Sequence, residues 1–125
     1  MFEIEIKGTV YQFSFGMGFM REINKKVGTP IDGLPDVKKN IGLQYYVAGI
    51  IDNDLEALIE VLDIANKSQN PRVTRALLDA YIDDENTDID SLFESVIGFL
   101  KSSNATKKTV EALLAAIEEQ KQNKN

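Results

Sequence analysis

The chain has 125 residues and no cysteine, so it can form no disulfide, thiol nucleophile or thiolate zinc site. It also has no histidine, the commonest general base and the commonest metal ligand among protein side chains. A Ser-His-Asp triad, an H-E-x-x-H zinc site and a two-histidine iron site are therefore excluded. Any catalysis would have to rest on carboxylates, lysines or tyrosines.

The sequence lacks any apolar run approaching the roughly 18 residues that a membrane-spanning helix needs. The start, Met1 to Ile6, carries acids where a signal peptide carries basic residues and a long apolar stretch. Basic residues are also in the minority, 14 against 20 acidic ones, and the net charge of -6 opposes binding to nucleic acid. We therefore expect a cytosolic protein that acts by binding other molecules, with no membrane or nucleic-acid partner.

Apolar and polar side chains alternate in the first part of the chain, which predicts a β-hairpin over residues 1–15 with its turn at Lys7-Gly8. Both edges of a two-stranded sheet carry unpaired backbone groups. We expect one edge to join neighbouring copies of the chain, unless a loop or helix covers it. The candidate edge residues are Phe2, Ile4, Ile6, Val10, Gln12 and Ser14.

Apolar residues at helical spacing predict five to six packed helices over residues 16–122 and a frayed tail at residues 123–125. The first helix carries Phe19, Met20, Ile23 and Val27 and is predicted to end at Gly28. The predicted fold is mainly α, of the α+β class, in one domain spanning residues 1–125.

Proline and glycine are concentrated between Gly28 and Pro35, which predicts a loop there. A second helix is then expected to begin at Pro35 or Asp36. Its apolar positions are Val37, Ile41, Tyr45 and Ala48.

Capping residues predict where the later helices begin. Asp52 is predicted to cap the third helix, and Asn70-Pro71 to begin the fourth. After a polar turn, Asp88 or Asp90 caps the fifth helix, and Asn104 caps the last one.

The string Tyr-Gln-Phe-Ser-Phe-Gly-Met-Gly-Phe-Met-Arg-Glu-Ile-Asn at Tyr11 to Asn24 follows a short Glu-Ile-Glu-Ile strand. It resembles the N-terminal signature of tail assembly chaperones from long-tailed phages and prophages of Gram-positive bacteria. The likeness continues in the same order along nearly the whole chain. The later pieces are Gly-Leu-Xaa-Tyr at Gly42 to Tyr45, Asp-Leu-Glu-Ala-Leu at Asp54 to Leu58, an acidic hinge at Asp83 to Asp90, and Leu-Lys-Ser-Ser-Asn-Ala-Thr at Leu100 to Thr106.

This resemblance implies a non-catalytic, cofactor-free protein of the bacterial host cytoplasm that is absent from the mature virion. Such a protein binds and solubilises the tape measure protein, helps recruit tail tube subunits and self-associates. The resemblance assigns no partner-contacting residue in this chain.

Other interpretations rest on the acids between Asp79 and Glu94. Four oxygen-bearing residues match the 1, 3, 5, 7 spacing of a calcium loop, but Ile89 stands at position 6 and Ser95 at position 12, where the loop needs Gly and Glu. The acids could instead make this an acidic inhibitor or DNA mimic, which is the alternative function. The four matching positions are Asp84, Asn86, Asp88 and Asp90.

The aromatic cluster of Phe13, Phe15 and Phe19 could hold a ligand, but packing of the hairpin on the first helix accounts for it better. Gly16 and Gly18 between them fit a strand-to-helix corner rather than a dinucleotide fingerprint, because a third glycine is missing.

Overall fold

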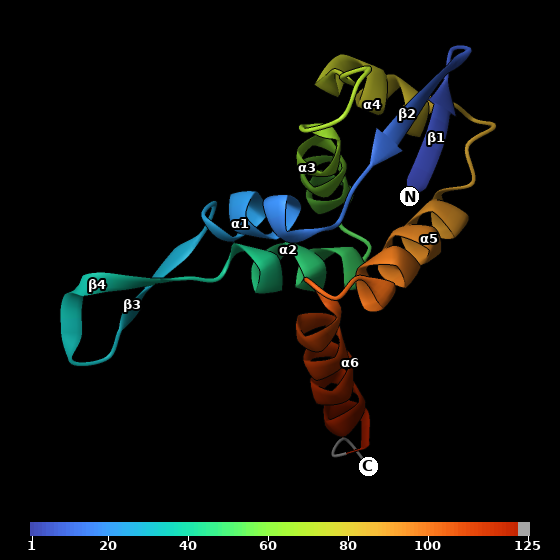
Figure 1. The fold of residues 1–125 in the computed structure, drawn as a ribbon. Coiled ribbons are helices and arrows are strands. Elements are labelled where there is room, and N and C mark those ends of the chain that lie inside the picture. Colours follow the sequence, from blue (N-terminus) through green and yellow to red (C-terminus); the bar gives the residue numbers. More distant parts are fainter. Residues whose placement is uncertain (123–125) are drawn as a thin grey trace.

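Two separate β-hairpins and six helices make up residues 1–122, the part of the chain that the computed structural model describes (Figure 1). The predicted frayed tail at 123–125 lies outside the described residues. The N-terminal hairpin and the mainly helical remainder confirm the predicted fold class. The elements are β1 (Phe2–Ile6), β2 (Thr9–Phe13), α1 (Met17–Asn24), β3 (Gly28–Ile31), β4 (Leu34–Asn40), α2 (Gly42–Ile51), α3 (Leu55–Asn66), α4 (Arg75–Asp83), α5 (Ile89–Ser102) and α6 (Lys107–Gln122).

The first hairpin has the predicted turn. Strands β1 and β2 pair antiparallel, from Phe2 opposite Phe13 to Ile6 opposite Thr9. Lys7 and Gly8 have φ angles of 51° and 83°, which matches the right-handed twist of the strands that the two-residue turn joins. The alternating apolar side chains of β1 are buried, so this hairpin covers one side of the core.

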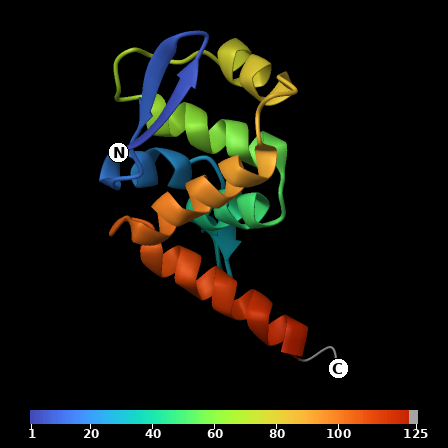
Figure 2. The same ribbon diagram turned by 90° about the vertical axis from the view of Figure 1, so that its right-hand side faces the viewer.

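Helix α3 lies at the centre of the core. Leu58, Val61 and Leu62 are fully buried, and the helix packs against α1, α2, α4 and β2. A second view shows α3, α2 and α5 beneath the first hairpin (Figure 2). One cluster of buried apolar side chains joins the hairpin to all six helices of the described chain.

Residues 28–40 form a hairpin in the structure, so the predicted loop from Gly28 to Pro35 and the predicted helix start at Pro35 or Asp36 are both wrong. The range 16–122 is therefore not helical throughout. Asp32-Gly33, with Gly33 at φ 79°, makes the turn, and the residues on either side of it pair antiparallel as strands. We refer to residues 28–40 as the arm, because this hairpin projects away from the helices (Figure 1).

Helix α2 begins only at Gly42, which packs against the backbone of Ile23 at the end of α1. A Cβ atom at position 42 would overlap the Ile23 carbonyl, so a larger residue cannot sit there without moving the backbone. Val37, expected in this helix, lies in β4 instead. Helix α1 ends at Asn24, before the predicted Val27.

Three predicted caps are displaced. Asp54, not Asp52, caps α3, because Asn53 adopts a φ of 62° and the chain turns there. Thr74, not Asn70, caps α4, and α6 begins at Lys107, three residues beyond Asn104. Asp88 caps α5 as predicted, with its carboxylate accepting from the Ser91 N–H at 3.1 Å.

Candidate functional site

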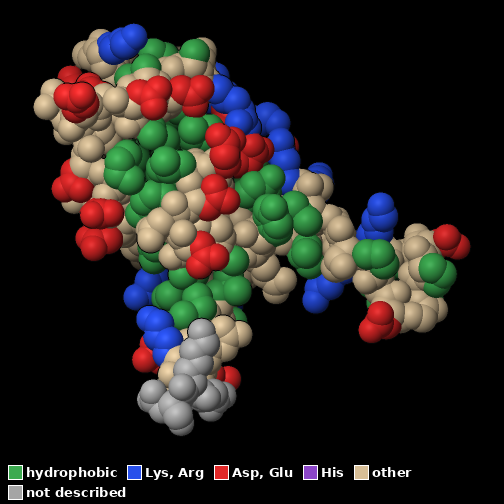
Figure 3. All heavy atoms as spheres, turned by 180° about the vertical axis from the view of Figure 1, so that it is seen from behind, with side chains coloured by type: hydrophobic (Ala, Val, Ile, Leu, Met, Phe, Trp, Pro, Cys, Tyr) green, Lys and Arg blue, Asp and Glu red, His purple; other side chains and the backbone are tan. Residues whose placement is uncertain are grey.

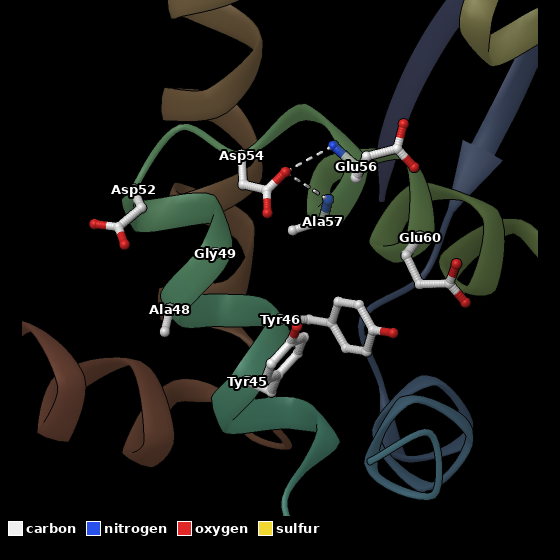
Figure 4. Close-up of a pocket in the computed structure, with 9 residues that line it drawn as sticks. All are labelled: Tyr45, Tyr46, Ala48, Gly49, Asp52, Asp54, Glu56, Ala57 and Glu60. Atoms are coloured by element: carbon white, nitrogen blue, oxygen red, sulfur yellow. Dashed lines mark hydrogen bonds between the residues drawn. The ribbon is translucent and has the colours of Figure 1, made fainter.

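A pocket of about 500 Å³ lies between α2 and the first turns of α3 (Figure 4). We call it the α2–α3 pocket. The two helices approach closely here, since a Cβ atom at Gly49 would come within 2.7 Å of the Ala57 methyl group. Tyrosine rings, alanines and carboxylates line the pocket: Tyr45, Tyr46, Ala48, Gly49, Asp52, Asp54, Glu56, Ala57 and Glu60.

The carboxylates of this pocket differ in what they contact. Glu60 forms ion pairs with Lys26, at 2.9 Å, and with Arg75. Asp54 is occupied as the cap of α3 and accepts from the Glu56 N–H at 3.0 Å. Asp52 and Glu56 are exposed and form no ion pair with any side chain in residues 1–122. The pocket therefore keeps two negative charges free for a partner.

Local hydrogen bonds and burial set the pKa values around this pocket. Burial acts to raise the pKa of Glu60, but hydrogen bonds from Arg75 and Lys26 outweigh it, so the pKa lies below its ordinary value. The hydrogen bond to Glu60 raises the pKa of Lys26 in turn. Burial raises the pKa of Tyr46. Glu60 is thus a charged structural group rather than an acid ready to exchange a proton.

The arm is the second candidate surface. Its residues are exposed or half-buried, and the apolar side chains of Leu34 and Val37 are 53% and 46% exposed. Figure 3 shows apolar, basic and acidic side chains side by side along it. Lys38 and Lys39 are exposed and make no ion pair within the described chain. Sequence reasoning missed this surface, although Asp-Gly between short apolar stretches is a known hairpin signal.

The residues of the predicted self-association edge lie in different environments in the structure. The side chains of Phe2, Ile4 and Ile6 point into the core, while Val10 is exposed. On β2, the Gln12 carbonyl accepts from Asn66 and the Ser14 N–H donates to the Ala65 carbonyl, so the end of α3 covers part of that edge.

The outer edge of β1 is the more open one. Because the turn closes on the pair of Ile6 and Thr9, the backbone groups of Glu3 and Glu5 point away from β2. These groups have no hydrogen-bond partner among the described residues. Self-association through an edge of this hairpin stays a prediction.

An apolar patch surrounds the start of the chain. Phe2 contacts Phe99 with ring centroids 5.1 Å apart, and the shallow cavity beside them has a volume of about 370 Å³. Met1 is 67% exposed and Phe99 38%. We call this the Met-Phe patch; its members are Met1, Phe2, Phe13, Phe15 and Phe99.

The aromatic cluster packs as predicted. The Phe15 and Phe19 rings lie 5.2 Å apart, which joins the segment after β2 to α1. Phe2 stacks on Phe15 at 6.4 Å. The three predicted aromatics, Phe13, Phe15 and Phe19, are all buried, and Phe99 extends the cluster to the surface.

The acids of the predicted turn face solvent, including Asp83, Asp84, Asp88 and Asp90. Asp84 accepts from the Asn86 N–H, and hydrogen bonds from Ser91 lower the pKa of Asp88. Across residues 1–122, no group of three acidic side chains is placed to hold a metal ion. None of the described helices is long and apolar enough to cross a membrane.

The candidate surfaces of the described chain are thus the exposed arm, the acidic α2–α3 pocket and the Met-Phe patch. The family model described as "Phage tail assembly chaperone protein, TAC" matches residues 3–114, and the chain belongs to this family. The match includes the arm and the α2–α3 pocket and ends within α6. No curated protein and no solved structure matches the chain significantly. A Gram-positive host stays a prediction.

Proposed function

We propose that this chaperone binds the tape measure protein of its phage, keeps it soluble until the tail tube encloses it, and helps recruit tail tube subunits. It acts by binding, in the cytoplasm of the bacterial host, and it self-associates along its partner. Membership of the tail assembly chaperone family carries this proposal.

The Met-Phe patch supports the proposal with a surface of suitable chemistry. The family resemblance implies a long, largely helical tape measure protein, and a helix of this kind exposes apolar stripes that aggregate in water. Methionine and phenylalanine side chains suit such a partner, because methionine adapts to irregular apolar surfaces and aromatic rings bury a large area. Contact through Met1 and Phe99 would be helix-in-groove binding, repeated along the partner.

Co-expression with the tape measure protein, followed by purification of the soluble fraction, tests this assignment. The wild-type chain is expected to bring the tape measure protein into solution and to purify with it. Phe99→Glu places a charge in the patch and is expected to abolish the complex. Leu55→Glu is the matched control, because Leu55 is 41% exposed, close to the 38% of Phe99, and lies on α3 away from the patch.

A complex that forms equally well with Phe99→Glu would rule out the Met-Phe patch as the binding surface. A tape measure protein that is expressed but stays insoluble beside the wild-type chain would contradict the function itself.

A further inference from the structure

The arm lacks the partner that a hairpin of its size needs. A two-stranded sheet is marginally stable in water unless its apolar face packs on another element. In the arm, no residue from Gly28 to Asn40 is buried. Leu34 and Val37 are 53% and 46% exposed, and the hairpin that carries them projects away from the helices (Figure 1). These side chains are therefore available to pack against another molecule.

The base of the arm is nevertheless held firmly. The Ile41 N–H donates to the Val27 carbonyl at 2.8 Å, and the Leu43 N–H donates to the side chain of Asn24 at 3.3 Å. The arm therefore projects from the helices in a fixed direction, away from the end of α2 that leads into α3 (Figure 1). This direction carries the arm away from the α2–α3 pocket of its own chain.

The α2–α3 pocket is complementary to the arm. Its apolar wall consists of tyrosine rings and alanine methyl groups, which suit aliphatic side chains such as those of Leu34 and Val37. Its rim carries Asp52 and Glu56, which form no ion pair in residues 1–122. On the arm, Lys38 and Lys39 lie next to each other at the end of β4 that leads into α2, and they also form no ion pair there. The two acids of the arm, Asp32 and Asp36, precede them in the chain. Opposite free charges on two surfaces of one chain favour contact between copies.

We propose that the arm of one copy occupies the α2–α3 pocket of a second copy. Leu34 and Val37 cover the apolar wall, and Lys38 and Lys39 face Asp52 and Glu56 of that second copy. The inference rests on the self-association in the proposed function and names the two surfaces that make it. Because the two surfaces differ, the contact is heterologous and continues into a ring or an open filament. The Met-Phe patch shares no residue with either surface and stays free in each copy.

Symmetric pairing of two β1 edges is the competing contact. Antiparallel pairing of these strands would bring Glu3 of one copy opposite or diagonal to Glu5 of the other. Like charges so placed destabilise a sheet. The arm also carries two exposed acids, Asp32 and Asp36, so its contact with the pocket avoids this repulsion only with Lys38 and Lys39 turned toward the rim.

Sedimentation velocity of the purified full chain over a range of concentrations tests the proposal. We expect the wild-type chain to form assemblies larger than dimers. The arm variant Leu34→Ser/Val37→Ser and the pocket variant Asp52→Lys/Glu56→Lys are each expected to need about tenfold or more protein to associate. The control Glu118→Lys/Glu119→Lys makes the same change of charge on exposed positions of α6 and is expected to assemble as the wild type does.

A mixture of the two variants distinguishes this contact from a symmetric one. The pocket variant keeps a wild-type arm, and the arm variant keeps a wild-type pocket, so these two surfaces can bind each other. The substituted arm of the arm variant and the substituted pocket of the pocket variant cannot bind a further copy. We therefore expect the equimolar mixture to form dimers and to stop there. Circular dichroism confirms that each variant is folded before it is mixed.

The proposal is overturned if the wild-type chain is monomeric at every concentration, if the variants assemble like the wild type, or if folded variants remain monomeric when mixed. The solubility of the tape measure protein is a separate readout. A monomeric chain that still solubilises it would reject the arm contact and leave the proposed function standing. Assembly that depends on the arm, without solubilisation of the tape measure protein, would support the arm contact and reject the proposed function.

Discussion

The side-chain amide of Asn66 donates a hydrogen bond to the backbone carbonyl of Gln12 at 2.9 Å and so ties the end of α3 to the first hairpin. Asn66 is fully buried, and its other contacts hold the segment that leads to α4. It donates to the Pro71 carbonyl at 3.2 Å and accepts from the Val73 N–H at 2.6 Å. One polar side chain thus joins three parts of the chain.

Replacing this side chain should destabilise the fold strongly. Asn66→Ala leaves the Gln12 carbonyl and the Val73 N–H without their partner in a buried site, and we expect a loss of about 3 kcal/mol in the free energy of unfolding. Urea unfolding followed by circular dichroism measures this loss. Asn104→Ala, at an exposed position, is the control and should change the free energy by less than about 0.5 kcal/mol. Equal effects of the two changes would contradict the role of Asn66.

The two glycines Gly42 and Gly98 should respond to alanine in opposite directions. Alanine at position 42 forces a methyl group against the Ile23 backbone, which should cost about 2 kcal/mol or more. Alanine at position 98 enters open space on α5 and should stabilise the protein by about 0.5–1 kcal/mol, because alanine is the better helix former. Thermal unfolding of the two variants is the measurement. A stabilised Gly42→Ala protein would contradict the close contact between α1 and α2.

The start of α3 can be tested with two neighbouring aspartates. Asp54→Ala removes the carboxylate that accepts from the first N–H groups of the helix and should cost about 1 kcal/mol. Asp52→Ala should cost less than about 0.5 kcal/mol, because Asp52 is exposed and lies outside the cap. Chemical unfolding of both variants compares them. The reverse order would place the helix start at Asp52 after all.

Glu60 should make the protein sensitive to acid. Its pKa in the folded protein lies below the ordinary value of 4.5, so the unfolded chain takes up a proton first as the pH falls. The stabilisation is therefore complete above pH 4.5 and is lost as the pH falls from there through the folded pKa.

The variant Glu60→Gln isolates this contribution. It should be about 1 kcal/mol less stable than the wild type at neutral pH, because Lys26 and Arg75 lose their ion-pair partner. The difference should shrink below pH 4.5, and unfolding curves over a pH series measure it. Glu118→Gln, on the exposed side of α6, is the control and should follow the wild type at every pH. A difference that does not change with pH would show that Glu60 contributes through packing rather than charge.

Local sequence signals predicted the parts of the fold that local interactions determine. Lys7-Gly8 correctly predicted the first turn, and Asp88 correctly predicted the start of α5. The arm was missed because the spacing of Val37 and Ile41 fits a helix as well as it fits a strand followed by a helix. In the structure, Asp32-Gly33 makes a turn, with Gly33 at a φ of 79°, and this turn pairs β3 with β4.

The interaction surfaces depend on contacts between distant parts of the chain. Asn66 and Gln12 are 54 residues apart, and only the folded chain shows that α3 covers the edge of β2. In the same way, the α2–α3 pocket exists because Gly49 lets two helices approach, which the spacing of residues does not reveal. The Met-Phe patch likewise joins Phe99 to the first residues of the chain through tertiary packing.

Co-expression of the wild-type chain with the tape measure protein, with the complex then purified in low salt and in about 1 M salt, tests the central claim most directly. We expect a soluble complex that survives the high-salt wash, because an apolar contact does not weaken as charge screening increases. A tape measure protein that stays insoluble, or a complex that dissociates in high salt, would contradict it.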